Sequence, residues 1–176
     1  MQNNFIQVIK TNSSADERGS FKKLFDRELQ LFLDFEIKQI NQVTNSHKFT
    51  LRGLHYQIEP FNEAKCFRVL KGKVFLVCVN INELSAQYLS YDSVILDDGR
   101  FAAFIPQQFA AGYCTLENNT ELIYFSNNIY KPECEKGILW SDPSIGINWP
   151  TDTPILSPKD ELWSLVKPIR KTKNRI

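Results

Sequence analysis

The 176-residue sequence lacks most of the short motifs that identify common classes of enzyme. It has no glycine-rich phosphate-binding loop and no G-x-S-x-G nucleophile motif. Only two histidines are present, His47 and His55, and the four cysteines have no C-x-x-C spacing, so the clustered ligands of a metal site are missing. The sequence therefore argues against P-loop and dinucleotide-binding folds and predicts no catalytic metal.

Long apolar runs are absent too. No run approaches the roughly 20 residues of a membrane-spanning helix, and the N-terminus lacks the charged and apolar regions of a signal peptide. The cysteines, which we expect to be reduced thiols, are Cys66, Cys78, Cys114 and Cys134. We expect a cytoplasmic protein that does not associate with membranes.

Charge of either sign is not in excess, since the net charge is +1, but the basic residues are unevenly placed. Residues 167–176, KPIRKTKNRI, contain five of the 21 Lys and Arg residues and no acid. Such a tail can contact nucleic acid, although a solvated terminus is the more common case, and we expect no nucleic-acid partner. The length predicts one domain over residues 1–176.

Aromatic residues and short alternating segments are abundant, with 13 Phe, six Tyr and three Trp. Turn residues separate about ten expected strands, at 5–11, 21–25, 36–43, 51–58, 65–72, 73–81, 88–96, 101–105, 110–117 and 120–127. We expect a turn at 12–19 and short helices at 26–35 and 160–166. This pattern predicts an all-β sandwich, barrel or jelly roll.

His55 lies in the segment LRGLHYQ (51–57), and its role has two interpretations. It is either a core histidine or a catalytic base. Arg52 and His55 would lie on opposite faces of a regular strand unless Gly53 permits a bulge. A hairpin through residues 58–64 could bring Lys65 beside His55, and Tyr124 is either a core residue or a member of the same site.

Six motifs together carry a family resemblance. They are RGSF (18–21), LRGLHYQ (51–57), KCFRVLKGKVF (65–75), FIPQQFAAGY (104–113), YKPECEKGILWSDPSIGINWP (130–150) and ILSPKD (155–160). In this order, and over nearly the whole chain, they resemble the dTDP-4-dehydrorhamnose 3,5-epimerase family. The combination is far more specific than any one of these short motifs.

The resemblance implies a cupin-type jelly roll of two antiparallel sheets with short peripheral helices. It implies a homodimer with exchanged N-terminal strands and a reaction that needs neither a metal nor a cofactor. The implied substrate is a nucleoside-diphosphate 4-keto-6-deoxyhexose. The implied reaction removes and returns a proton at carbons next to the C4 ketone, in the biosynthesis of deoxysugars and surface polysaccharides.

The resemblance also implies a set of site residues. The family's base falls on His55, its orienting carboxylate on Asp160, its proton donor on the opposite face on Tyr124, and the positive residue near the keto oxygen on Lys65. The implied substrate contacts are Arg18, Arg52, Tyr130, Glu135 and Lys159, of which Tyr130 stacks on the nucleobase.

Elementary chemistry agrees with these implied roles. A base with a pKa near neutrality suits the removal of a proton next to a ketone, and histidine, at about 6.5, is the natural choice. A carboxylate on the far ring nitrogen fixes the tautomer, and a lysine stabilises the negative charge that develops on the keto oxygen. Because inversion needs a proton from the opposite face, a second group such as a tyrosine is required.

The sequence departs from the family pattern at a few positions. Leu76 stands where the family has Asp and Ala111 where it has His, so an acid and an imidazole are lost together; Gln108 replaces a Gly, and Lys23 replaces an acid of many relatives. Three interpretations stay open: an epimerase acting at C3, at C5 or at both, a 3,4-ketoisomerase on a similar sugar, or a non-catalytic sugar-nucleotide binder.

Overall fold

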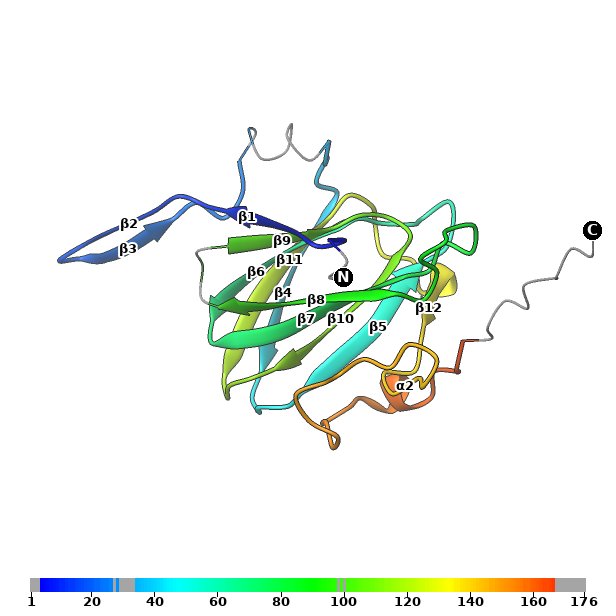
Figure 1. Ribbon diagram of the computed structural model, residues 1–176. Coiled ribbons are helices and arrows are strands. Elements are labelled where there is room, and N and C mark those ends of the chain that lie inside the picture. Colours follow the sequence, from blue (N-terminus) through cyan, green and yellow to red (C-terminus); the bar gives the residue numbers. More distant parts are fainter. Residues whose placement is uncertain (1–3, 27, 29–33, 98, 100, 167–176) are drawn as a thin grey trace, which may run out of the picture.

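Two five-stranded antiparallel sheets face each other in the computed structural model, which describes residues 4–26, 28, 34–97, 99 and 101–166 (Figure 1). The first sheet has the order β1 (Gln7–Lys10), β9 (Phe101–Ile105), β6 (Lys65–Lys71), β11 (Thr120–Ser126) and β4 (Gln39–Asn45). The second has the order β12 (Glu135–Gly137), β5 (Leu51–Gln57), β10 (Phe109–Thr115), β7 (Lys73–Asn80) and β8 (Tyr91–Asp97).

The main core lies between the two sheets, because both contribute inward-facing apolar side chains to it. Its largest members include Phe67 and Leu122 from the first sheet and Leu76 and Tyr113 from the second. Two further apolar clusters cover the outer faces, one around Phe35 and Phe125 and one around Leu54 and Val77. The all-β prediction is confirmed, and so is the prediction that strand 73–81 is covered on both faces.

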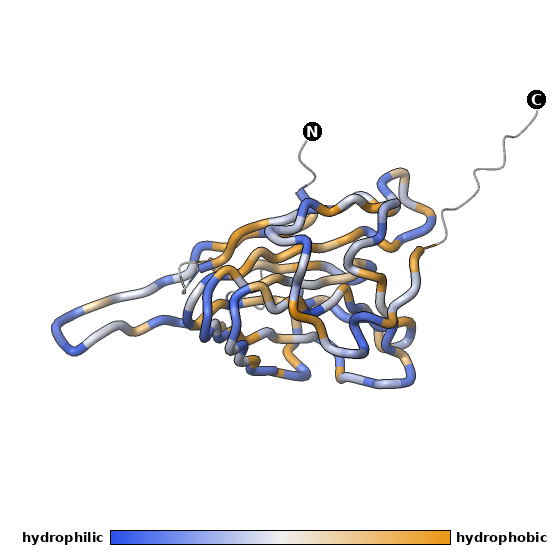
Figure 2. The backbone as a smooth tube through the Cα atoms, turned by 90° about the horizontal axis from the view of Figure 1, so that it is seen from below, coloured by the Kyte–Doolittle hydropathy of each residue, from blue (hydrophilic) through white to orange (hydrophobic). Residues whose placement is uncertain are grey.

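A two-stranded hairpin projects from the body where the sequence predicted a turn at 12–19. β2 (Ser13–Asp16) pairs with β3 (Gly19–Lys22), and Figure 1 shows this hairpin extending away from both sheets. Its tip is hydrophilic, in contrast to the apolar segments that run through the body (Figure 2). The turn prediction was wrong at β2, where every residue is exposed and the hydrophobic alternation by which strands are detected is missing, whereas β3 overlaps the strand expected at 21–25.

Helices are few and short in the part of the chain that is described. α2 (Pro158–Glu161) begins two residues earlier than the predicted helix 160–166 and ends sooner, and η1 (Pro132–Cys134) is one 3₁₀ turn. The Ser157 side chain accepts a hydrogen bond from the Asp160 backbone N–H, which caps α2. Most of the predicted helix 26–35 lies outside the described residues. None of the described helices is long and apolar enough to cross a membrane.

Candidate active site

A cleft opens between the two sheets and is made of two adjoining hollows of about 280 and 300 Å³. His55, Lys65 and Tyr124 line both hollows, so these three side chains stand where the hollows meet. The first hollow, called here the outer hollow, also contains Tyr130 and Glu135. The second, called here the inner hollow, is lined in addition by Arg52, Tyr113, Ser157, Lys159, Asp160, Val43, Phe67, Ala111 and Gly112.

A bulge in the pairing of β5 with β10 brings Arg52 and His55 into the same hollow. His55 is opposite Ala111 but Arg52 is opposite Tyr113, so the register shifts between them. Gly53 permits this shift because it has a φ of +119°, and a Cβ there would lie 2.6 Å from the Cα of Gly112. The bulge that the sequence suggested at Gly53 is thereby confirmed.

His55 and Asp160 form a close pair at the edge of the cleft. The Nε2 atom of His55 lies 2.5 Å from Oδ1 of Asp160, and the Asp160 carboxylate also accepts a hydrogen bond from the Trp163 indole N–H at 3.3 Å. Burial alone raises the pKa of the Asp160 carboxyl, but its hydrogen bond to His55 and the charge of that ring outweigh burial and hold this pKa below its ordinary value. The carboxylate is therefore kept ionised and is aimed at the imidazole.

A second carboxylate approaches the other ring nitrogen of His55. Oε1 of Glu135 lies 3.9 Å from Nδ1, while Oε2 accepts hydrogen bonds from the Tyr130 hydroxyl and from Nζ of Lys159. Burial raises the pKa of the Glu135 carboxyl, but these two donors outweigh burial and lower it overall. Tyr130, Glu135 and Lys159, which the sequence predicted as substrate contacts, thus form one network at the mouth of the cleft.

Two glutamines of the strands hold the loop that carries Tyr130. The side chain of Gln39 accepts a hydrogen bond from the Tyr130 backbone N–H at 2.8 Å, and Gln57 accepts one from Lys131 at 2.6 Å. Gln57 also donates to the carbonyl of Ile129. The backbone of Tyr130 is therefore held in place, while 45% of the residue remains exposed.

Lys65 faces His55 from the opposite sheet. The sequence suggested that both residues could belong to one hairpin, but β5 and β6 lie in different sheets, so that expectation was wrong. Nζ of Lys65 is 3.0 Å from Oε1 of Glu63, and the Ser126 hydroxyl donates to the same carboxylate. This half-buried ion pair fixes the end of the flexible lysine side chain inside the cleft.

Tyr124 stands on β11 beside Lys65, with its ring 5.3 Å from that of Phe67. Burial, followed by the charges of Glu63 and Glu135, raises the pKa of Tyr124 to about 12. Its hydroxyl is therefore protonated at neutral pH. The ring packs on the core and also lines both hollows, and the role of Tyr124 in the site stays a prediction.

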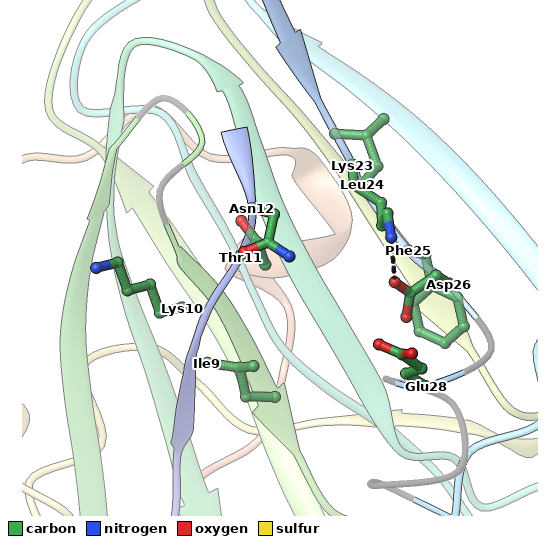
Figure 3. A pocket seen from close by; sticks show the side chains of 9 residues that line it. All are labelled: Ile9, Lys10, Thr11, Asn12, Lys23, Leu24, Phe25, Asp26 and Glu28. Atoms are coloured by element: carbon green, nitrogen blue, oxygen red, sulfur yellow. Dashed lines mark ion pairs between the residues drawn. The ribbon is translucent and has the colours of Figure 1, made fainter. Parts of the chain in front are cut away.

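The residues that depart from the family pattern lie in different parts of the structure. Ala111 lines the inner hollow next to His55, whereas Leu76 is fully buried in the core between the sheets and does not line it. Both belong to one apolar cluster on the paired strands β10 and β7, where Ala111 is opposite Cys78 and Leu76 is opposite Tyr113. Lys23 lies away from the cleft, where it pairs with Asp26 in a cavity of about 410 Å³ beside β1 (Figure 3).

Arg18 is set apart from the other predicted contacts. It lies near the tip of the projecting hairpin, where its guanidinium pairs with Asp16 at 2.6 Å and 85% of its side chain is exposed. His47 is exposed in the turn after β4 and does not line the cleft. Thus the cleft gathers eight of the nine predicted site residues from a single chain.

Sequence reasoning missed several residues that line the cleft or support it. These are Gln39, Asn41, Glu63, Tyr113 and Trp163. Their signal was weak because they stand in ordinary strands or in the short segments beside β6 and α2, and only the facing of the two sheets brings them near His55. Trp163 packs on Gly137, where a Cβ would lie 2.2 Å from the indole, and this contact places the indole N–H beside Asp160.

The geometry supports proton transfer on a bound small molecule. An imidazole–carboxylate pair can remove a proton, an ammonium group across the cleft can stabilise negative charge, and a protonated tyrosine can return a proton. Among the described residues, no three or more His, Cys, Asp or Glu side chains are grouped as metal ligands, and the absence of a catalytic metal stays a prediction. Fold and site together define a jelly-roll protein with an acid–base cleft.

Comparison with known proteins narrows this class to one family. The profile of the dTDP-4-dehydrorhamnose 3,5-epimerase family matches residues 4–167, so the chain belongs to that family. The family's enzyme from Shigella flexneri is 39% identical over 160 residues, which are 88% of this chain and 87% of that protein.

Solved structures agree with the assignment. The dTDP-4-dehydrorhamnose 3,5-epimerase of Bacillus anthracis, with TDP and pyrophosphate bound, superposes with a TM-score of 0.88 at 29% identity and covers 94% of this chain and 98% of its own. The dTDP-6-deoxy-D-glucose-3,5-epimerase of Legionella pneumophila, in complex with dTDP-4-keto-L-rhamnose, has a TM-score of 0.86 at 33% identity and covers 94% and 89%. The predicted fold is confirmed by these likenesses.

Proposed function

We propose that this chain is a cofactor-independent epimerase of a nucleoside-diphosphate 4-keto-6-deoxyhexose. The observation that carries the proposal is the convergence of His55–Asp160, Lys65 and Tyr124 in one cleft. A binding protein gains nothing from a base held by a carboxylate opposite a protonated tyrosine, whereas an epimerase needs both groups. Membership of the epimerase family supports the same conclusion.

In the proposed reaction, His55 removes a proton from a carbon next to the C4 ketone. The C–H bond breaks, its electron pair forms a carbon–carbon double bond to C4, and the keto oxygen becomes an enolate oxygen. Asp160 holds the ring in one tautomer and stabilises the imidazolium that results; loss of such a carboxylate costs up to about 10⁴-fold in rate in a serine protease triad. The substrate's own carbonyl is thus the electron sink.

Lys65 and Tyr124 complete the reaction. The ammonium of Lys65, fixed by Glu63, stabilises the enolate oxygen. The Tyr124 hydroxyl then gives a proton to the opposite face of the carbon, which inverts its configuration. Because the pKa of Tyr124 is raised to about 12, the donor stays protonated until the enolate forms.

In this proposal the base of the nucleotide occupies the outer hollow, and its diphosphate lies beside Arg52 and Lys159 of the inner hollow. Tyr130 stacks on the base, since its ring is exposed on a backbone that Gln39 and Gln57 fix. Arg52 and Lys159 supply positive charge for the diphosphate, as the side chains of both line the inner hollow. Glu135 links Tyr130 to Lys159 and so sets the relative position of these two contacts.

The biological unit in this proposal is a cytoplasmic homodimer with exchanged N-terminal strands. The projecting β2–β3 hairpin supports it, because an exposed strand pair that extends away from both sheets is stabilised when a second chain covers it (Figure 1). Arg18 near its tip would then reach the cleft of the partner as a substrate contact. Four free cysteines agree with a reducing compartment.

The proposal is tested by NMR in heavy water with dTDP-, GDP- and CDP-linked 4-keto-6-deoxyhexoses. The expected result is deuterium at C3, C5 or both, together with inverted products. Migration of the ketone would instead identify the 3,4-ketoisomerase. Binding of the sugars with no deuterium exchange on all three would identify a non-catalytic binder.

A further inference from the structure

The buried side chain of Asn45 joins the two sheets beside the inner hollow. Asn45 is the last residue of β4, and only 3% of it is exposed. Its Oδ1 atom accepts hydrogen bonds from Nε of Arg52 at 2.9 Å and from the Tyr113 hydroxyl at 3.3 Å, and its amide nitrogen donates to the Thr120 carbonyl at 3.2 Å. Arg52 and Tyr113 both line the inner hollow, so Asn45 supports two groups that face a bound ligand.

These contacts allow only one orientation of the Asn45 amide. Because its nitrogen is bound to the Thr120 carbonyl, its oxygen faces Arg52 and Tyr113. Burial raises the pKa of Tyr113 to about 12, so the hydroxyl stays protonated and donates at neutral pH. From Arg52, Asn45 takes only the N–H group on Nε, and it does not use the N–H groups of the terminal nitrogens.

Arg52 differs from the lysines of the cleft in the charge of its partner. Lys65 is paired with the carboxylate of Glu63, and Lys159 with that of Glu135. Arg52 is held by a neutral amide instead, and none of the ion pairs found among the described residues includes it. Because Arg52 is exposed, water hydrates its charge without a counter-ion. The amide therefore fixes the guanidinium without cancelling its charge.

This inference rests on the proposed function, in which the diphosphate of the nucleotide lies beside Arg52. We propose that Asn45 is a positioning residue that aims the Arg52 guanidinium at the diphosphate and, because it is uncharged, leaves the full positive charge to that anion. An arginine suits this contact, since its planar N–H groups match phosphate oxygens. A carboxylate at position 45 would weaken the site, because the diphosphate would then compete with an internal anion.

Asn45→Asp tests the effect of charge at this position. Aspartate has nearly the same size and keeps an acceptor for Arg52 and Tyr113, but it adds a negative charge. We expect the affinity for dTDP, measured by calorimetry, to fall about tenfold, and its dependence on salt concentration to become shallower. The affinity for thymidine, which has no phosphate, should stay unchanged when it is measured by ligand-observed NMR.

Asn45→Leu separates the charge from the structural link between the sheets. Leucine removes the acceptor for Arg52 and the donor to Thr120 without adding charge, and we expect a loss of dTDP affinity of only about threefold. A purely structural role of Asn45 predicts the reverse order, because aspartate preserves the hydrogen bond to Arg52 and leucine does not.

Two controls accompany these variants, and circular dichroism reports whether each protein folds. Asn148→Asp adds the same charge at an exposed residue that lines neither hollow, and it should leave both affinities unchanged. In an Arg52→Gln background, Asn45→Leu should lower the affinity for dTDP no further, since the group that Asn45 positions is gone. This comparison tests the inference even when Asn45→Asp fails to fold.

The possible outcomes are distinct. A loss of dTDP affinity that is larger for Asn45→Asp than for Asn45→Leu, with thymidine unaffected, supports the assignment. Unchanged affinity, a larger loss for leucine, a parallel loss for thymidine, or a further loss in the Arg52→Gln background overturns it while the proposed function stands. A wild-type protein that binds none of dTDP, GDP and CDP contradicts the proposed function and the inference with it.

Discussion

At the scale of single residues, the cleft is built from charged pairs that hold one another in place. His55 is held by Asp160, Lys65 by Glu63, and Lys159 by Glu135. A largely buried charge without a partner is costly, so Lys65 requires Glu63, whereas the side chain of Lys159 is 49% exposed. The sequence could indicate His55 and Asp160 through a family resemblance. The pairing of Lys65 with Glu63 depends on the pairing of β6 with β11, which places Ser126 opposite Lys65.

The Tyr124→Phe substitution tests the assigned proton donor. We expect inversion to slow by about 10²-fold, because the donor is lost. Exchange of the substrate proton with solvent should slow much less, since His55 can still remove and return a proton on its own face. Product stereochemistry and deuterium content, followed together by NMR, separate the two rates. Inversion at full speed would show that Tyr124 is not the donor.

Alkaline pH tests the burial of the tyrosines in the cleft. Burial raises the pKa of Tyr113 and of Tyr124 to about 12 each, above the ordinary value of about 10. The folded state therefore binds these protons more tightly than the unfolded state, and the stability they contribute is complete below about pH 10 and is lost as the pH rises toward about 12.

Urea unfolding at a series of alkaline pH values measures this loss. The Tyr113→Phe/Tyr124→Phe double variant should lose less free energy of unfolding than the wild type over the same range, because Phe has no proton to lose. An identical decline in both proteins would contradict the burial of these hydroxyls.

At the scale of elements, the contact between β5 and β10 positions His55. Gly53 and Gly112 allow the two strands to approach closely, and the resulting register shift turns Arg52 and His55 toward one hollow. The dipeptide Arg52–Gly53 gave a usable signal for this bulge in the sequence. No signal in the sequence showed which strands share a sheet. β5 and β6 are consecutive along the chain and yet belong to opposite sheets.

Gly53→Ala is expected to lower the free energy of unfolding by about 3 kcal/mol, through backbone strain and overpacking against Gly112. The reason is the positive φ of residue 53 and a Cβ that would lie 2.7 Å from the Ala111 carbonyl oxygen. Gly146→Ala is the matched control: its φ is +66° but nothing lies within 4 Å, so we expect a loss of only about 1 kcal/mol. Equal urea midpoints for the two variants would contradict the close contact.

Strand positions were largely predictable, and the reason is visible in the packing. Segments such as 65–71 and 73–80 have faces buried by the core, and burial imposes the apolar pattern that the sequence displays. β2 escaped prediction because all of its residues are exposed, whereas β3 overlaps the strand expected at 21–25. Similarly, the residues that fix the Tyr130 loop, Gln39 and Gln57, look like ordinary polar strand residues until the loop is placed against them.

At the scale of the whole molecule, the projecting hairpin leaves Arg18 outside the cleft that it is expected to serve. Mixed dimers test whether a partner supplies it. Arg18→Ala and His55→Asn, refolded together, should regain about a quarter of wild-type activity, because half of the dimers are mixed and each of these has one complete site of two.

The control for this experiment is a mixture of His55→Asn with Asp160→Asn. These two residues pair within one chain, so no mixed dimer contains a complete site and activity should not return. Recovery in the control, or none with Arg18→Ala, would contradict the exchange of hairpins between two chains.

The most direct measurement of the central proposal is the rate at which solvent deuterium enters a 4-keto-6-deoxyhexose nucleotide in the presence of the wild-type protein and of His55→Asn. We expect labelling beside the ketone with the wild type and a rate about 10³-fold lower with the variant, at an unchanged affinity for the nucleotide. Labelling by His55→Asn at the wild-type rate would contradict the account.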